Sequence, residues 1–418
     1  MTEKPLKFCM VSTFYPPYNF GGDGMHIYRL SNALARRGHS VDVFYCEDAF
    51  LFLNGAPPND QFRNQERVRL RPLKSIAGVI SPLITQQTGI PFFKGDLKRA
   101  LESEDYDVIH YHNISLIGIK ALSYGSAVKL YTLHEHWLVC PMHVLWKFDR
   151  EVCTTKSCFS CQIAGRRPPQ VWRKTGMMDR MLGHVDRFIA PSRFTRDKHR
   201  EMGLDIPITH LPHFLPAQDN DSISGGRAEN ERPYFLYVGR LERIKGVQNL
   251  IAAFSTLGEH DLVIAGDGPY RDQLEQMAEG RTNIRFLGKL GPEALAERYR
   301  GATAVLVPSI CYETFGIILI EAFSHATPVI VNDLGALPEV VNDSNGGIVY
   351  GNQEELEGAV RKLAGDPGLR NSLGENGHRA YEKYWTEEVH IRSYLEMIES
   401  ARDLRTLTSK AETSVAVG

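Results

Sequence analysis

Short apolar runs alternate with amphipathic stretches along this chain, and the alternation starts again after residue 230. In the first half, the amphipathic stretch MHIYRLSNALARRGH lies between the apolar runs LKFCMVSTF and SVDVFYC. In the second half, VQNLIAAFSTLG lies between PYFLYVGR and HDLVIAGDG. Strands that alternate with helices in this way form βα units on a parallel sheet. The pattern therefore predicts an α/β fold with two doubly wound, Rossmann-like domains.

The length and charge of the chain agree with this prediction and exclude some partners. Its 418 residues exceed one ordinary hydrophobic core, which favours two or three domains. The formal net charge of −2 gives no global reason to expect a nucleic-acid partner. No apolar run is long enough to span a bilayer, and the start MTEKPLKFCMVSTFYPP leads into a strand rather than a secretory signal. We therefore expect a cytoplasmic protein that does not bind nucleic acid.

A polar stretch divides the chain. Residues 215–233, LPAQDNDSISGGRAENERP, are poor in apolar side chains and predict a linker between domains at 1–214 and 234–385. Two such domains tend to face each other across a cleft, where the carboxyl ends of both sheets bind ligands. An amphipathic helix is expected at 386–408. Residues 72–93 are apolar and broken by proline and glycine, which is typical of a lid, an acceptor loop or a partly buried insertion.

A pair of glutamates flanks a predicted helix start in the run SICYETFGIILIEAFSHATPVI. Glu313 lies in the turn after an apolar strand, and Glu321 lies deeper in a helix that begins near Gly316. The amides of Phe315, Gly316 and Ile317 should lack partners there, and such amides attract phosphate. The carboxylates could then hold hydroxyl groups on either side, as a sugar joined through a diphosphate to a nucleoside requires. A single glutamate is more often part of a solvated helix face, but the pair favours a ligand site.

Basic residues precede this helix in the second domain. Arg240 and Lys245 lie in its first βα loop, within YVGRLERIKGVQNLI, where cations can neutralise a departing diphosphate. The alternative is a solvated surface. Lys289 and Leu290 end a later strand, and their backbone groups are candidates for contact with a nucleobase edge.

A glycine turn follows the first strand in YPPYNFGGDGMHIYRL. Gly21 and Gly22 allow the backbone to approach a phosphate or an acceptor closely, although a tight βα turn is an equal alternative. The glycine spacing does not match the dinucleotide fingerprint. Asp42 and Glu47, in and after the second strand, still leave a nicotinamide interpretation open. His134, in YTLHEHW, ends another strand and is a candidate donor to a sugar hydroxyl or a phosphate oxygen, or a structural histidine.

Four of the seven cysteines cluster in CPMHVLWKFDREVCTTKSCFSC, at positions 140, 153, 158 and 161. Four thiolates at this spacing can close a tetrahedral zinc site, and C-x2-C is a frequent half-site. Cys140, Cys153, Cys158 and Cys161 would then form a structural site, because protein fills all four positions. Two disulfides or four free thiols are the alternatives, and a cytoplasmic location favours zinc.

Just beyond the cysteines, basic and apolar side chains mix in GRRPPQVWRKTGMMDRML. Arg166, Arg167, Arg173 and Lys174 lie beside Trp172. Such a mixture can rest on an anionic membrane surface, which would suit a lipid-linked acceptor, or can form a solvated loop.

Six separated motifs also share their order with a known family: GGDG, TLHE, APSRFTRD, GRLERIKG, AGDGP and E-x7-E. Together they resemble the retaining glycosyltransferases of family 4, which have the GT-B fold, and the resemblance covers nearly the whole chain. It implies an acceptor-side first domain, a second domain that binds a nucleotide-sugar donor, and a C-terminal helix that packs back on the first domain. The four-cysteine insertion departs from the common family pattern.

The resemblance implies a role for the candidate residues. The positions of Arg240 and Lys245 bind the donor diphosphate. That of Glu313 holds the donor sugar, and that of Glu321 holds the ribose. His134 lies beside the transferred sugar. The candidate catalytic residues are therefore His134, Arg240, Lys245 and Glu313.

The implied reaction moves a sugar from a nucleotide-diphosphate-sugar to an acceptor hydroxyl with retention at the anomeric carbon. The departing diphosphate accepts the acceptor proton in a front-face mechanism, and the glycine loop at Gly21 and Gly22 approaches the phosphates or the acceptor. No cofactor is required, because Arg240 and Lys245 supply the counter-charge. The acceptor would be a sugar, a lipid-linked molecule or a small molecule, in polysaccharide, glycolipid or natural-product synthesis. A nucleotide-sugar epimerase and a non-catalytic nucleotide-sugar-binding subunit are the alternatives.

Overall fold

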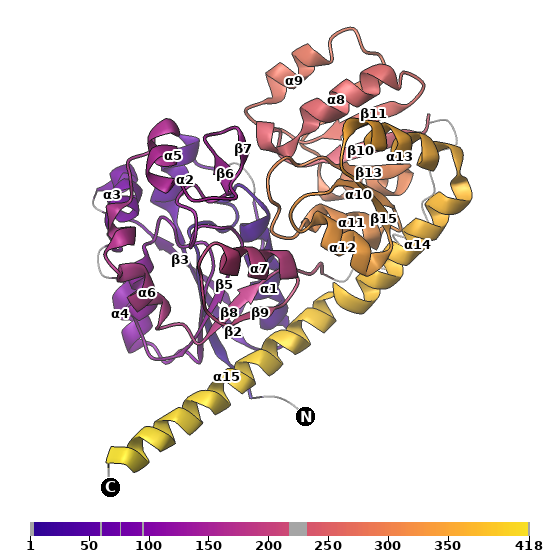
Figure 1. Cartoon of the computed structure of the whole chain (residues 1–418). Helices are drawn as coiled ribbons and strands as arrows, with labels where there is room; N and C mark the ends of the chain where they lie inside the picture. Colours follow the sequence, from indigo (N-terminus) through magenta and orange to yellow (C-terminus); the bar gives the residue numbers. More distant parts are fainter. Residues whose placement is uncertain (1–3, 59–60, 76, 94–95, 217–231, 417–418) are drawn as a thin grey trace.

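The computed structural model describes residues 4–58, 61–75, 77–93, 96–216 and 232–416. Their strands form two parallel sheets, one in each half of the chain, and a two-stranded hairpin (Figure 1). The predicted α/β fold with two Rossmann-like domains is therefore confirmed. Most of the predicted linker 215–233 lies outside the described residues.

The sheet of the first domain has seven strands in the order β3-β2-β1-β4-β5-β8-β9. Neighbouring strands are parallel throughout. The strands are β1 (Lys7–Val11), β2 (Ser40–Cys46), β3 (Val68–Leu73), β4 (Val108–Tyr111), β5 (Val128–Thr132), β8 (Arg187–Ala190) and β9 (Ile208–His210). The helices are α1 (Gly22–Arg36), α2 (Glu47–Asn54), η1 (Gly78–Ile80), α3 (Ser81–Thr88), α4 (Asp96–Ser103), η2 (Ile119–Ser123), α5 (Cys158–Ala164), η3 (Val171–Lys174), α6 (Met177–Leu182) and α7 (Arg193–Glu201). The hairpin consists of β6 (Trp146–Lys147) and β7 (Glu151–Val152).

The sheet of the second domain has six parallel strands in the order β12-β11-β10-β13-β14-β15. The strands are β10 (Tyr234–Val238), β11 (Asp261–Ala265), β12 (Ile284–Gly288), β13 (Ala304–Val307), β14 (Val329–Asn332) and β15 (Gly347–Tyr350). The helices are η5 (Arg243–Lys245), α8 (Val247–Thr256), α9 (Arg271–Met277), α10 (Pro292–Gly301), α11 (Ile317–Ser324), α12 (Leu337–Ser344), α13 (Gln353–Gly365), α14 (Pro367–Tyr384) and α15 (Glu387–Ala416).

Each sheet has apolar side chains on both faces. In β1, Phe8 and Met10 join one core cluster, whereas Cys9 and Val11 join another on the opposite face. Successive side chains of a strand point to opposite faces, so a strand that is apolar throughout needs cover on both sides. The helices supply this cover, which explains why the strands of both domains appear in the sequence as continuous apolar runs.

Helix α15 leaves the second domain and runs along the first (yellow in Figure 1). Ile391, Tyr394 and Ile398 are buried in the same core cluster as Phe8 and Met10. Farther along the helix, basic side chains form ion pairs with carboxylates of the first domain, including Arg402 with Asp107 and Arg405 with Asp186, both at 2.6 Å. The helix therefore fastens the two halves together. None of the helices among the described residues combines the length and apolar character that crossing a membrane requires.

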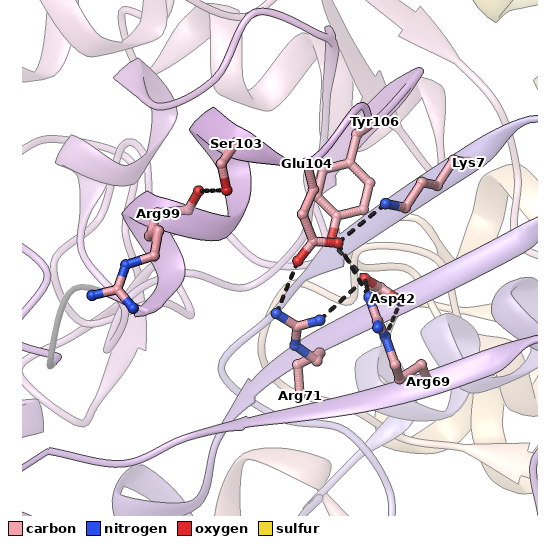
Figure 2. Close-up of polar contacts among 8 residues, drawn as sticks. All are labelled: Lys7, Asp42, Arg69, Arg71, Arg99, Ser103, Glu104 and Tyr106. Carbon is pink, nitrogen blue, oxygen red and sulfur yellow. Dashed lines mark hydrogen bonds and ion pairs between the residues drawn. The ribbon is translucent and has the colours of Figure 1, made fainter.

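Asp42 belongs to a polar network near the amino end of β2 (Figure 2). Its carboxylate accepts hydrogen bonds from Arg69 Nε at 2.8 Å and from the Tyr106 hydroxyl at 2.6 Å. Glu104 extends the network through an ion pair with Lys7 at 3.1 Å. Ligands of parallel α/β sheets bind at the opposite, carboxyl ends of the strands. The position of Asp42 therefore does not suit a nicotinamide-ribose ligand, and its contact with Arg69 ties β2 to the edge strand β3.

Candidate active site

A cleft with a volume of about 490 Å³ lies between the two domains. Most of the predicted site residues line it, from both sides: Gly21, Gly22, His134, Arg240, Lys245, Glu313, Phe315, Gly316, Ile317 and Glu321. Two of the predicted donor-binding residues, Lys289 and Leu290 after β12, are not among the described residues that line the cleft. Their contact with a nucleobase therefore stays a prediction. The predicted cations, carboxylates and helix start come from separate segments of the sequence, and all of them line this one cleft.

The start of α11 forms one wall of the cleft. Gly316 precedes the helix with a φ of 93°, a left-handed conformation that favours glycine. A Cβ at this position would also lie 2.9 Å from Leu337 Cδ2. Across the cleft, a Cβ on Gly22 would lie 3.8 Å from Ile317 Cγ2, so the glycine loop of the first domain faces the first turn of α11. The first amides of a helix have no intrahelical acceptor, and this wall can therefore receive an anion.

Lys245 and Glu313 form an ion pair in the cleft, with Nζ and Oε1 2.7 Å apart. Ser309 Oγ donates a second hydrogen bond to the same oxygen at 2.6 Å. Burial alone would raise the pKa of Glu313, but the Lys245 charge and the two hydrogen bonds outweigh burial and lower it. Both side chains keep contact with the cleft, with 28% and 20% of their surface exposed. Lys245 therefore carries its charge at the place where an anion would bind.

The local fold explains why Lys245 points into the cleft. It ends η5, and Gly246 follows with a φ of 77°. A Cβ on Gly246 would lie only 1.9 Å from the Pro308 carbonyl oxygen, so the loop after β10 lies directly against the loop after β13. This contact brings Lys245 to Ser309 and Glu313. Arg240 lines the cleft from the same loop and pairs with Glu242 at 2.6 Å.

Glu321 is held by partners from both domains. Arg29 Nη2 of α1 lies 3.3 Å from Glu321 Oε1, and the Tyr299 hydroxyl donates to Oε2 at 3.0 Å. Sequence reasoning missed Arg29. Its position two helical turns after Gly22, on the same face of α1, was the available signal.

His134 lies at the first-domain side of the cleft among other histidines. Its Nε2 is 2.9 Å from Nδ1 of His112, and its ring lies 5.1 Å from that of His213. Burial lowers the pKa of His134 to about 4. The ring is therefore neutral near pH 7, and it can donate or accept a hydrogen bond without carrying charge. Its Nδ1 is shielded from solvent and has no partner among the described residues.

Further residues of the cleft escaped the sequence analysis. His143 Nδ1 lies 2.7 Å from Glu135 Oε2, and both side chains line the cleft together with Asp23 and His213. Asp23 and Glu135 adjoin residues that had been singled out, so adjacency could have identified them. His143 and His213 depend on tertiary folding, since no local pattern marks either one.

Direct hydrogen bonds join the first domain to the second beside the cleft. The backbone amides of Arg193 and Phe194, at the start of α7, each donate to the Glu339 carboxylate at 2.8 Å. Ser192 Oγ donates to the Thr314 carbonyl oxygen at 2.7 Å. Thr314 is the residue between Glu313 and Phe315, so this contact fixes the wall that carries the ion pair. A carboxylate at a helix start is also favoured by the helix dipole.

The four clustered cysteines line one small pocket next to the cleft wall. Their thiols form no disulfides. No three His, Cys, Asp or Glu side chains in the described part of the chain already surround a metal position.

Two family models account for the two domains. Residues 20–218 match "Glycosyltransferase Family 4", and residues 219–380 match "Glycosyl transferases group 1". The chain is similar to glycogen synthase of Mycobacterium tuberculosis, with 28% identity over 87% of this chain and 87% of that protein. Its fold is similar to that of sucrose-phosphate synthase from Thermosynechococcus elongatus, with a TM-score of 0.70, 21% identity, and coverage of 96% of this chain and 100% of that one. Anabaena HepE in complex with UDP-glucose has a TM-score of 0.63 and 15% identity, over 94% of this chain and 100% of that one.

These matches agree with the arrangement of two Rossmann-like domains around one cleft. The chain is a glycosyltransferase with the GT-B fold, in which the first domain matches the Family 4 model and the second matches the group 1 model.

Proposed function

We propose that this enzyme transfers a sugar from a nucleoside-diphosphate-sugar to an acceptor hydroxyl with retention at the anomeric carbon. The observation that carries the proposal is the shared cleft of Arg240, Lys245, Glu313 and the start of α11. Two cations and the first amides of a helix suit a diphosphate better than any neutral ligand. The UDP-glucose complex of HepE, which has the same fold, supports a nucleotide-sugar as the donor class.

In this proposal, Arg240, Lys245 and the α11 amides bind the diphosphate and stabilise the charge that develops as it departs. Glu313 holds the hydroxyl groups of the donor sugar, and Glu321 holds the ribose. The neutral ring of His134 donates a hydrogen bond beside the transferred sugar. Because the ring is uncharged, it adds orientation without repelling the positive charge that develops on the sugar.

Front-face attack is the proposed route to retention. The Glu313 carboxylate is engaged by Lys245 and Ser309, which makes it a poor nucleophile for a covalent glycosyl intermediate. The departing diphosphate oxygen lies on the side of the acceptor in such a mechanism and takes the acceptor proton. No cofactor enters this step, since the side-chain cations supply the counter-charge.

The acceptor is proposed to be a sugar, a lipid-linked molecule or a small molecule, bound on the first domain. Exposed apolar side chains favour peripheral contact of a cytoplasmic protein with a membrane. Phe159, Ile163 and Val171 are 56%, 56% and 65% exposed, and Arg166 and Arg167 lie exposed beside them. Sedimentation with vesicles should show binding to anionic but not to neutral lipid.

The sequence prediction for this membrane segment needs one correction. Trp172 is only 6% exposed, and Arg173 packs over its ring at 5.1 Å, so neither belongs to the proposed membrane surface. The Trp172 indole donates instead to the Gln86 carbonyl oxygen at 2.9 Å, which ties η3 to α3.

A panel of UDP-, GDP- and ADP-sugars tests the function directly. The proposal expects one donor class to raise the melting temperature and to release nucleoside diphosphate when an acceptor is added. Proton NMR of the product should show the anomeric configuration of the donor. Inverted product would refute retention, and an epimerised sugar formed without acceptor would indicate an epimerase instead. Binding without turnover across the panel would indicate a non-catalytic subunit.

A further inference from the structure

The loop after β5 brings four cysteines together from three separate segments. Cys140 follows the strand end that carries His134, Cys153 follows the hairpin strand β7, and Cys158 and Cys161 lie in the first turns of α5. All four line one pocket of about 20 Å³. Three of the four side chains are buried, and Cys158 is partly exposed. Unrelated surface cysteines would have no reason to line one pocket, so this arrangement favours a shared ligand.

Backbone amides point at the sulfur atoms. Phe148 N–H donates to Cys161 Sγ at 3.4 Å, and the amides of Met142 and Leu145 hydrogen-bond to the Cys140 thiol. Such bonds favour thiolate over thiol, because a hydrogen bond to the charged form stabilises it. A bound cation would suit the same arrangement, since a thiol that coordinates a metal is deprotonated outright.

The chain winds tightly where these amides lie. His143, Leu145, Phe148 and Asp149 all have positive φ, between 48° and 75°. Residues other than glycine keep this conformation only where their surroundings hold it. The four residues lie between the first two cysteines, so a centre that binds both cysteines would hold the turn.

Arg173 supplies an independent sign of negative charge. Its guanidinium lies over the rings of Trp137 and Trp172, 4.9 and 5.1 Å from their centroids. The Nη2 atom is shielded from solvent and has no hydrogen-bond partner among the described residues. Cys140 and Cys158 lie within electrostatic reach of this guanidinium. A shielded guanidinium nitrogen with no partner in the described part of the chain, close to Cys140 and Cys158, favours an anionic neighbour.

We propose that Cys140, Cys153, Cys158 and Cys161 bind one structural zinc ion as thiolates. A Zn²⁺ ion with four thiolates carries a net charge of about −2, which Arg173 partly balances. The thiols turn into the pocket and lose their protons when the ion enters. The centre has no open position for water or substrate, so it takes no chemical part in the transfer.

The centre would shape the wall of the active-site cleft. The segment between Cys140 and Cys153 carries His143 and Val144 into the cleft lining. Its hairpin faces the second domain, where Arg243 Nη1 lies 3.8 Å from Asp149 Oδ2 (Figure 1). Zinc would therefore fix the part of the first domain that meets the donor side, and this consequence rests on the proposed function. The metal site itself does not depend on it.

Metal analysis of the full chain tests the proposal. Protein purified under a reducing agent and without chelator should contain about one zinc per chain. A mercurial thiol reagent should release that zinc, and Co²⁺ in its place should give the absorption bands of a tetrahedral thiolate site. Absence of zinc with four reactive thiols, or two disulfides in the cluster under native conditions, would overturn the proposal.

Variants separate this site from the catalytic one. Cys161→Ser should lose most of the zinc, whereas Cys46→Ala, a buried cysteine outside the cluster, should keep it. Arg173→Gln should retain the fold and weaken zinc binding about 10-fold or more, as changes next to metal ligands do. Lys245→Ala should keep full zinc content even if it is inactive. An Arg173→Gln protein that binds zinc as tightly as the wild type would refute the charge argument.

Discussion

Replacing Lys245 with alanine removes a cation from the proposed diphosphate site and leaves the Glu313 carboxylate with one strong partner, Ser309. Loss of a single donor aimed at developing negative charge typically costs about 100- to 1,000-fold in kcat. The structure adds a second cost. A hydrogen bond to a charged group contributes about 1.5–3 kcal/mol to the free energy of unfolding. Because both side chains of the pair are partly exposed to the cleft, we expect a loss near the lower end of this range.

The two effects can be measured separately. Steady-state assays report kcat and the KM for the donor, and urea denaturation reports the free energy of unfolding. The double variant Lys245→Ala/Glu313→Gln should recover most of the lost stability, because no unpaired carboxylate remains, and it should still be inactive. Arg243→Ala is a matched control, since Arg243 lies two residues away and contacts Asp149 outside the cleft lining. Activity of Lys245→Ala within a few-fold of the control would refute the assigned role.

Three further predictions follow from the same contacts. Tyr299→Phe removes a hydrogen bond to Glu321 and should raise the donor Kd about fivefold in calorimetry with little change in kcat. Glu339→Gln weakens the carboxylate contact to the start of α7, and should lower the free energy of unfolding by about 1–2 kcal/mol and increase the radius of gyration in solution scattering. Burial lowers the pKa of His134 and His390 to about 4 from 6.5. Between pH 6.5 and 4 the unfolded chain binds protons that the folded chain excludes, so stability is complete above pH 6.5 and falls by up to about 1.4 kcal/mol per pH unit for each histidine.

Each of these outcomes has a control. Tyr234→Phe removes another buried tyrosine hydroxyl, bonded to the Arg298 carbonyl oxygen, and should leave donor affinity unchanged. For Glu339→Gln, unchanged scattering and unchanged stability would show that the α7 contact does not hold the domains together. For the histidines, His134→Gln should reduce the pH dependence measured by urea denaturation at pH 7 and 5. An identical dependence in wild type and variant would contradict the burial argument.

The sequence by itself determined the fold class and most of the segments that line the cleft. Strands buried on both faces appear in the sequence as continuous apolar runs between amphipathic stretches. This pattern can be recognised from neighbouring residues alone. The group from Glu313 to Glu321 was also predictable, because a strand, a turn and a helix start follow each other within one βα unit. Arg240 and Lys245 were predictable for the same reason, since they occupy the first loop after a strand.

Only the tertiary structure decided which side chains meet. Arg29 and Glu321 are 292 residues apart, and Lys245 and Glu313 are 68 residues apart. The periodicity of a short sequence segment carries no information about such pairs. They form only when the sheets and their loops pack together in the folded chain. The same holds for Arg173, which the sequence placed on a surface and which packs against the rings of Trp137 and Trp172 near Cys140 and Cys158. Side-chain direction is decided by packing, and packing is a property of the whole fold.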